Sequence, residues 1–213
     1  MMYTHIKQLF TGGKPAAGAK GALILLHGRG ASAVDIMRLA GQLNTADFAL
    51  YAPQATNNSW YPYSFMAPVE DNEPALSSAL NLIDEVVNQA VADGFSTENI
   101  YFTGFSQGAC LSLEYVARNA KQYGGVAAFT GGLVGAELIK GNYKGDFKQT
   151  PIFIGTGNPD PHVPLSRVED SVEVLKGLGA DVTLTVYEGR PHTISFDEIK
   201  LADQLIFKTA EEA

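Results

Sequence analysis

The chain has little cysteine, little positive charge and no long hydrophobic run. One cysteine, Cys110, stands among its 213 residues, so no intrachain disulfide can form. That fits a reducing compartment such as the cytoplasm. No stretch approaches the roughly 18 consecutive apolar residues that cross a bilayer, and the N-terminus carries no signal-peptide pattern. We therefore expect a cytoplasmic protein without a membrane span.

The shortage of positive charge also limits the partners. Lys and Arg number 15 against 23 Asp and Glu, which gives a net charge of -8. Proteins that bind a phosphate backbone usually present basic surfaces, so we expect no nucleic-acid partner. Hydrophobic residues make up 46% of the chain and charged residues 18%, a composition unlike that of disordered chains. The length predicts one domain over residues 1–213.

Short apolar runs alternate with amphipathic segments along the chain. The predicted strands are Gly21–Leu26, Phe48–Ala52, Asn99–Gly104, Val126–Thr130, Pro151–Gly155 and Val182–Tyr187. Because the runs are apolar throughout, we expect both faces of the sheet to be covered by helices. Apolar residues at helical spacing predict helices around 76–91 and 165–178, and Ser195 with Glu198 forms a capping box for a last helix. This alternation predicts an α/β fold with a doubly wound, mostly parallel sheet.

A long irregular segment runs from Pro53 to Glu73 and carries several aromatic residues. Loops of this length in a compact domain are uncommon and often functional. Two interpretations stay open: the aromatic side chains wall an apolar substrate pocket, or they only cover the edge of the sheet. On the first interpretation, Trp60, Tyr61 and Phe65 are the candidate substrate-binding residues.

The strongest motif is a G-x-S-x-G at Gly104–Gly108, between a predicted strand and a helix-compatible run. On a tight strand-to-helix turn the serine backbone is strained and its hydroxyl projects, while the glycines let the strand and the helix approach each other. The helix also directs its N-terminal amides at the site. Because this pattern arises by chance in a chain with 22 glycines, its context carries the prediction that Ser106 is a nucleophile.

A serine hydroxyl needs a positioned base, and the chain has four histidines. His192 lies between the last predicted strand and the last helix, at the edge of the sheet where open α/β folds bind ligands. We predict that His192 takes the proton from Ser106; the alternative is a capping or solvent-facing histidine. His5, in the N-terminal segment, is expected to be an ordinary surface residue.

A third residue should be a carboxylate that orients the imidazole. Asp160 follows a predicted strand directly, in a loop that three prolines stiffen. Asp170 falls within a helical pattern and Asp181 in a turn, so both are poorer candidates. The chain order Ser106, Asp160, His192 is the Ser…Asp…His order of the α/β-hydrolase class.

An acyl-transfer site also needs N–H donors for an oxyanion. We predict the backbone N–H groups of Gln107 and of Arg29, in the loop His27–Gly30. The alternatives for this loop are a simple glycine turn or a phosphate-binding loop, but it lacks both G-x-G-x-x-G and the Lys-Ser/Thr of a nucleotide-binding loop. Whether the Arg29 side chain attracts an anionic substrate stays open.

Other reactive residues give weaker signals. Cys110 lies one helical turn after the serine and fits a core role better than that of a second nucleophile. Asp160 and His162 could together offer two metal ligands, but no third residue clusters with them in sequence, so we expect no metal.

Several of these stretches resemble the phospholipase/carboxylesterase family of α/β-hydrolases, which includes acyl-protein thioesterase-like enzymes. The matching stretches follow the family's order over most of the chain: 25–30, 52–54, 60–61, 104–109, 155–157, 160–164, 189 and 192–195. The resemblance implies the triad Ser106, Asp160 and His192, oxyanion donors at Arg29 and Gln107, and no cofactor. It also implies activity on small to medium acyl esters, sometimes thioesters.

One position departs from the family pattern. Acyl-protein thioesterases usually place an aspartate after the His-Gly-x-Gly loop, where this chain has Ala31. That argues against protein depalmitoylation.

The leading hypothesis is therefore a cofactor-independent carboxylesterase whose partner is a small-molecule ester. A thioesterase or lysophospholipase with the same triad is the second hypothesis, and a non-catalytic binding module on the same fold is the third. Nothing in the sequence sets the oligomeric state, so a homodimer stays open.

Overall fold

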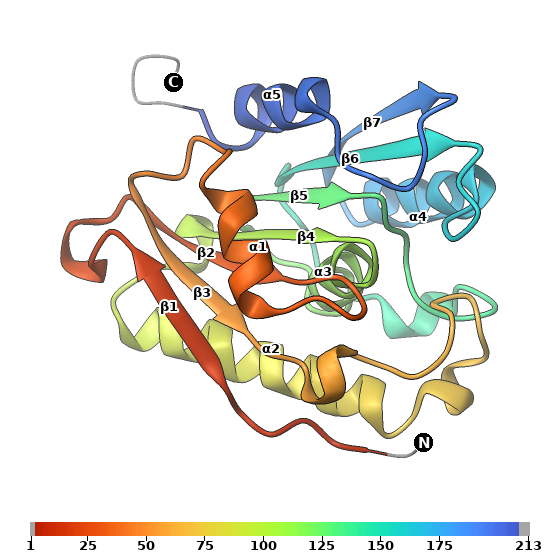
Figure 1. Cartoon of the computed structure of the whole chain (residues 1–213), viewed down its shortest axis with the longest axis horizontal. Helices are drawn as coiled ribbons and strands as arrows, with labels where there is room; N and C mark the ends of the chain where they lie inside the picture. The colour runs from red at the N-terminus through yellow and green to blue at the C-terminus, as the bar shows by residue number, and fades with distance from the viewer. Residues whose placement is uncertain (1–2, 209–213) are drawn as a thin grey trace.

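The computed structural model describes residues 3–208, and a sheet of seven strands forms its centre (Figure 1). In chain order these are β1 Leu9–Gly13, β2 Gly21–Leu26, β3 Phe48–Pro53, β4 Ile100–Phe105, β5 Gly125–Phe129, β6 Pro151–Asn158 and β7 Asp181–Glu188. They lie side by side in the order β1-β3-β2-β4-β5-β6-β7. β1 pairs with β3 in the antiparallel sense, and all other neighbours are parallel. The predicted mostly parallel sheet is confirmed.

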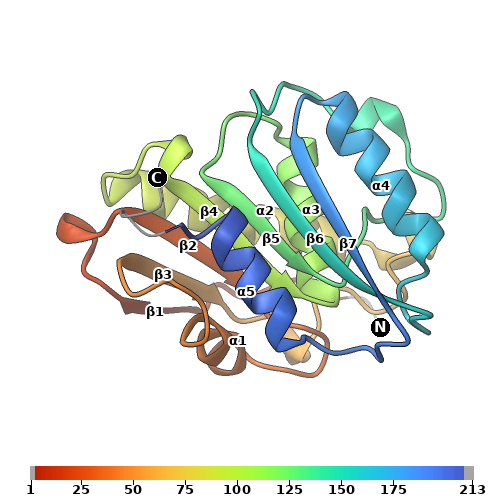
Figure 2. The same cartoon turned by 90° about the horizontal axis from the view of Figure 1, so that it is seen from above.

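Helices cover both faces of the sheet (Figure 2). The α-helices of the described chain are α1 Ala33–Ala40, α2 Ala75–Ala92, α3 Gln107–Arg118, α4 Leu165–Gly177 and α5 Phe196–Leu205. Successive side chains of a strand point to opposite faces. Accordingly Ile24 of β2 packs in the core under α2, α3 and α4, whereas Leu25 packs in a second core under α1 and α5. This two-sided burial explains why β2 is apolar at every position.

Two elements were absent from the sequence prediction, and one strand differs from it. β1 and the eight-residue α1 were not predicted. β7 was expected to be buried on both faces, but its central residues are only half-buried. The reason is position: β7 ends the sheet and has a neighbour on one side only.

Local signals at the helix ends agree with the sequence. Ser195 accepts a hydrogen bond from the Glu198 amide while the Glu198 side chain accepts one from the Ser195 amide, which confirms the capping box. Between Pro53 and Glu73 the chain forms only two short 3-10 turns, so this segment is irregular as expected. Across residues 3–208, every helix is too short or too polar to traverse a lipid bilayer.

Candidate active site

Ser106 sits on the tight turn between β4 and α3. Its backbone has φ 55° and ψ -119°, a conformation that non-glycine residues rarely adopt and that surrounding contacts must hold. The Ser106 amide donates to the carbonyl of Phe129 at 3.0 Å, and the amide of Cys110 donates to the Ser106 carbonyl at 3.0 Å. The hydroxyl therefore projects from a turn that is fixed on both sides.

The two glycines of the motif allow this turn to pack. A Cβ atom on Gly108 would lie 2.0 Å from the carbonyl oxygen of Leu26, and one on Gly104 would lie 2.5 Å from the backbone of Gly108. Real Cβ atoms do not come this close to backbone atoms. The start of α3 thus rests directly on the end of β2 and on β4, which is why both positions are glycine.

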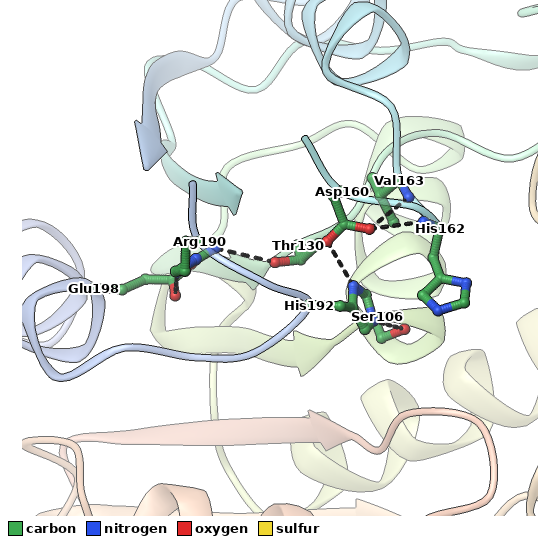
Figure 3. A network of polar contacts seen from close by, with 8 residues as sticks. All are labelled: Ser106, Thr130, Asp160, His162, Val163, Arg190, His192 and Glu198. Carbon is green, nitrogen blue, oxygen red and sulfur yellow. Dashed lines mark hydrogen bonds and ion pairs between the residues drawn. The ribbon is translucent and has the colours of Figure 1, made fainter. Parts of the chain in front are cut away.

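The three side chains predicted to act together meet at the carboxyl edge of the sheet (Figure 3). Nε2 of His192 lies 2.8 Å from Oγ of Ser106, and Nδ1 of His192 lies 2.7 Å from Oδ2 of Asp160. Ser106 follows β4, Asp160 follows β6, and His192 follows β7. Parallel strands bring residues 86 positions apart in sequence to the same edge.

The carboxyl group of Asp160 is held in its ionised form. Burial alone would raise its pKa, but hydrogen bonds from His192 and from the amides of His162 and Val163 outweigh burial, so the pKa lies below its ordinary value. The two amides donate to Oδ1 at 2.8 and 3.0 Å. Because an ionised carboxylate only accepts hydrogen bonds, Nδ1 of His192 must carry the proton. Nε2 is then left to accept the proton of Ser106.

The two predicted oxyanion donors lie beside Ser106. The Gly28 backbone packs on the turn that carries Ser106, since a Cβ there would lie 3.3 Å from the Phe105 carbonyl oxygen and 3.7 Å from Cβ of Ser106. Arg29 comes next in this loop, and Gln107 begins α3, where backbone N–H groups lack partners within the helix. Both residues line the cavity that contains Ser106.

The side chains of Arg29 and Gln107 form hydrogen bonds to the irregular segment that precedes α2. The exposed guanidinium of Arg29 donates to Oγ of Ser59 and to the carbonyl oxygens of Pro62 and Tyr63. The Gln107 amide group accepts from the backbone of Trp60 at 2.9 Å and donates to the Tyr61 carbonyl at 2.8 Å. Together they tie the irregular 59–63 segment to the site.

Buried His27 shapes the loop that carries Arg29. The Ala55 amide donates to Nε2 of His27 at 3.1 Å, so the proton resides on Nδ1, which donates to the Gly28 carbonyl at 2.8 Å. Burial lowers the pKa of His27, consistent with a neutral ring. Its own carbonyl accepts from the indole N–H of Trp60 at 2.8 Å. These hydrogen bonds of His27 therefore hold the loop in one conformation.

A cavity of about 610 Å³ opens at Ser106. Tyr61 and Phe65 lie in its wall, as the pocket interpretation of the 53–73 segment required. Trp60 does not: it is fully buried and does not line the cavity, because its indole is directed at the His27 carbonyl. Naming Trp60 as a substrate-contacting residue was wrong, because its side chain packs against the loop that begins at His27 instead.

Two histidines have surroundings that the sequence did not reveal, whereas Cys110 is buried as its predicted core role requires. His162 lines the cavity with its ring edge-on to that of His192, the ring centres 4.9 Å apart. His5 is not an ordinary surface residue, because its ring accepts from the Thr56 amide and donates to the Trp60 carbonyl. Cys110 is buried, and burial raises the pKa of its thiol to about 12. In residues 3–208, His, Cys, Asp and Glu nowhere gather in threes as a metal ion would need.

The comparisons with known proteins agree on one family. The family profile described as phospholipase/carboxylesterase matches residues 13–210. Carboxylesterase SOBER1 of Arabidopsis thaliana is 26% identical, with 88% of this chain and 90% of the relative covered. Acyl-protein thioesterase 1 of Gibberella zeae is 28% identical, with 91% and 93% covered.

A solved structure extends this agreement to three dimensions. The phospholipase/carboxylesterase of Dyadobacter fermentans is 63% identical, with 97% of this chain and 99% of that chain covered and a TM-score of 0.96. The family predicted from the sequence motifs is thereby confirmed. The chain belongs to the phospholipase/carboxylesterase family and is an ester hydrolase with the α/β-hydrolase fold.

Proposed function

We propose that this protein is a serine carboxylesterase that cleaves small to medium acyl esters with Ser106 as nucleophile, His192 as base and Asp160 as orienting acid. The observation that carries the proposal is the continuous pair of hydrogen bonds, 2.8 Å from Ser106 to His192 and 2.7 Å from His192 to Asp160. Members of such a unit act within hydrogen-bonding reach of one another.

In the first half of the reaction, Oγ of Ser106 attacks the acyl carbon while Nε2 of His192 removes the hydroxyl proton. The carbonyl oxygen becomes an oxyanion, which accepts hydrogen bonds from the backbone N–H groups of Arg29 and Gln107. When the tetrahedral intermediate collapses, His192 passes its proton to the departing alcohol. The acyl group then remains esterified to Ser106.

Water completes the cycle. It takes the place of the alcohol, gives a proton to His192 and attacks the acyl-enzyme, after which Ser106 regains its proton and the carboxylic acid leaves. Asp160 stays ionised throughout and stabilises the imidazolium. The lowered pKa of the Asp160 carboxyl supports that role.

The cavity supports the substrate class. A volume of about 610 Å³ accommodates a small ester, and Tyr61 and Phe65 offer an apolar wall to its acyl group. No cofactor enters the reaction, because the nucleophile, base and oxyanion donors all come from the chain.

The direct test is Ser106→Ala, assayed with p-nitrophenyl butyrate. Loss of the nucleophile in a serine hydrolase lowers kcat by roughly 10⁶-fold, and we expect a loss of that order. Wild-type protein should also label with a fluorophosphonate probe, and the variant should not. A folded Ser106→Ala variant that keeps most of the activity would overturn the proposal.

A thioesterase reaction is the second candidate, because several relatives are named acyl-protein thioesterase. The same residues would serve, since only the leaving atom changes. Values of kcat/KM for matched butyryl ester and butyryl thioester substrates decide between the two, as specificity is the ratio of these values.

A further inference from the structure

A buried ion pair lies next to the loop that carries His192 (Figure 3). Arg190 and Glu198 form it, with side chains 9% and 0% exposed. Arg190 stands two residues before His192 in the 189–195 loop, and Glu198 stands in the first turn of α5. Because one partner lies before His192 in the chain and the other after it, the pair closes the segment around the imidazole.

Arg190 also reaches the other side of the site. Its Nη2 lies 3.3 Å from Oγ1 of Thr130, the residue directly after β5. Thr130 has φ 58°, unusual for a β-branched residue, and its amide donates to Gly155 at 2.7 Å. The residue before it, Phe129, accepts the hydrogen bond from the Ser106 amide. Arg190 thus connects the His192 loop to the backbone beside Ser106.

The pair packs directly on the sheet because β6 carries two glycines there. A Cβ atom on Gly155 would lie 2.1 Å from Oε1 of Glu198, and one on Gly157 would lie 2.4 Å from the carbonyl oxygen of Arg190. On the other side the guanidinium of Arg190 lies over the ring of Tyr187, 4.5 Å from its centre. The pair is enclosed by backbone and ring, so its partners have little room to move.

Stability alone does not account for this arrangement. Nε of Arg190 and Oε1 of Glu198 are buried without a hydrogen-bond partner among the described residues. Buried ion pairs with unsatisfied groups contribute little net stability, and apolar residues of the same size often replace them at no loss. The pair instead restricts the loop that carries His192, because two charged groups joined across that loop favour one loop conformation.

We propose that Arg190 and Glu198 are positioning residues that hold Nε2 of His192 in line with Oγ of Ser106. The proposal rests on His192 being the base of the proposed function. Neither residue lines the cavity at Ser106, so both would act through the imidazole.

The first experiment compares Glu198→Gln with Glu114→Gln. Glutamine keeps the size of the side chain and can serve in the capping box, but it removes the charge. A misplacement of about 1 Å costs up to about 100-fold in rate, so we expect Glu198→Gln to lower kcat by 10- to 100-fold with KM changed less than threefold. Glu114 is the matched control: it is also fully buried and paired with an arginine, Arg118, but on α3. Glu114→Gln should lose thermal stability and keep kcat.

The second experiment asks whether the effect passes through His192. In a His192→Ala background the imidazole that the pair orients is gone, so adding Glu198→Gln should not lower the residual kcat further. A purely structural pair would lower kcat by the same factor in both backgrounds. Equal factors would overturn the proposal, as would a folded Glu198→Gln variant with wild-type kcat.

A milder variant covers the case in which Glu198→Gln does not fold. Thr130→Val preserves the shape of the side chain and the ion pair but removes the acceptor for Nη2 of Arg190. We expect kcat to fall threefold to tenfold with KM unchanged; an unchanged kcat contradicts the proposal. If Ser106→Ala and His192→Ala abolish turnover while these variants keep the wild-type kcat, the positioning role fails and the proposed function stands.

Discussion

Ser106 and His192 lie 2.8 Å apart, yet the chain places them by opposite means. Ser106 is placed locally: its left-handed backbone and the glycines at 104 and 108 set the direction of the hydroxyl. His192 is placed from a distance, by Asp160 in the loop after β6 and by Glu198 in α5. We call the glycine-flanked turn at Ser106 the local device and the contacts that Asp160 and Glu198 provide the distant support. The local device leaves a pattern in consecutive residues of the sequence, whereas the distant support can be recognised only in the folded protein.

Among substitutions that keep both Ser106 and His192, the largest loss of activity should come from replacing Asp160, which removes a support of His192 but leaves the turn at Ser106 intact. Asp160→Asn replaces the carboxylate by a neutral amide that no longer fixes the proton on Nδ1, so we expect kcat to fall by roughly 10⁴-fold, as for the equivalent change in serine proteases. KM and thermal stability should change far less. The control is Asp170→Asn, on an exposed position of α4, which should keep wild-type kcat. A loss confined to KM would show that Asp160 does not orient the base.

The local device is tested by Gly108→Ala. The added methyl group would meet the Leu26 carbonyl oxygen at 2.0 Å, so α3 must move away from β2. We expect the free energy of unfolding to drop by about 4 kcal/mol or more, measured by urea denaturation.

Gly177→Ala is the matched control for that change. Gly177 ends α4, and a Cβ atom there meets nothing within 4 Å. Alanine at this position should leave stability unchanged or raise it by up to about 1 kcal/mol. Equal effects of the two substitutions would mean that the turn at Ser106 is not tightly packed.

Lowering the pH should remove the stabilising contribution of the ionised Asp160 carboxylate, which supports His192, but should leave the turn at Ser106 unaffected. The folded-state pKa of Asp160 lies below its ordinary value of 3.8, so its ionised form stabilises the fold above that pH. This contribution is lost as the pH falls below 3.8 towards the folded-state pKa. The stability difference between wild type and Asp160→Asn should therefore shrink in urea denaturation between neutral pH and about pH 3. A constant difference would contradict the assigned direction of the pKa.

The smallest effect is expected at Cys110, beside the local device. Burial raises the pKa of its thiol to about 12, so almost no thiolate exists at neutral pH. Iodoacetamide at about pH 8 should leave the esterase rate unchanged, and Cys110→Ala should cost only about 1 kcal/mol of stability. Rapid inactivation by iodoacetamide would show instead that the thiol is accessible from the cavity.

Features set by consecutive residues could be predicted from the sequence, whereas features set by contacts between distant residues mostly could not. β2 was predicted to the residue, because two covered faces demand an unbroken apolar run. That Ser106, Asp160 and His192 lie together could be predicted because each follows a strand, and parallel strands share one edge. β1 was missed because its Gly12-Gly13 lacks any strand preference and its order comes from antiparallel pairing with β3. α1 was missed because eight residues offer little periodicity.

Side-chain partners across the fold were the remaining gap. Glu198 was interpreted as the capping-box partner of Ser195, and its second bond, to Arg190, was not predicted because the two residues lie 8 positions apart across a loop and a helix end. Trp60 was assigned to the pocket because an aromatic residue on a long loop gives the same pattern whether it faces a cavity or lies beneath it. Trp60 and Tyr61 are both fully buried, but only Tyr61 lines the cavity, and that difference is a property of the fold.

The position of Trp60 makes it an intrinsic fluorescence probe of the active site. It is the chain's only tryptophan, it is fully buried, and its indole N–H bonds the carbonyl of His27 at the start of the Arg29 loop. Intrinsic emission excited at the indole band therefore originates next to the loop that carries Arg29 and nowhere else in the molecule. Ligand titrations and unfolding transitions followed by this emission report on the floor of the active site without any label.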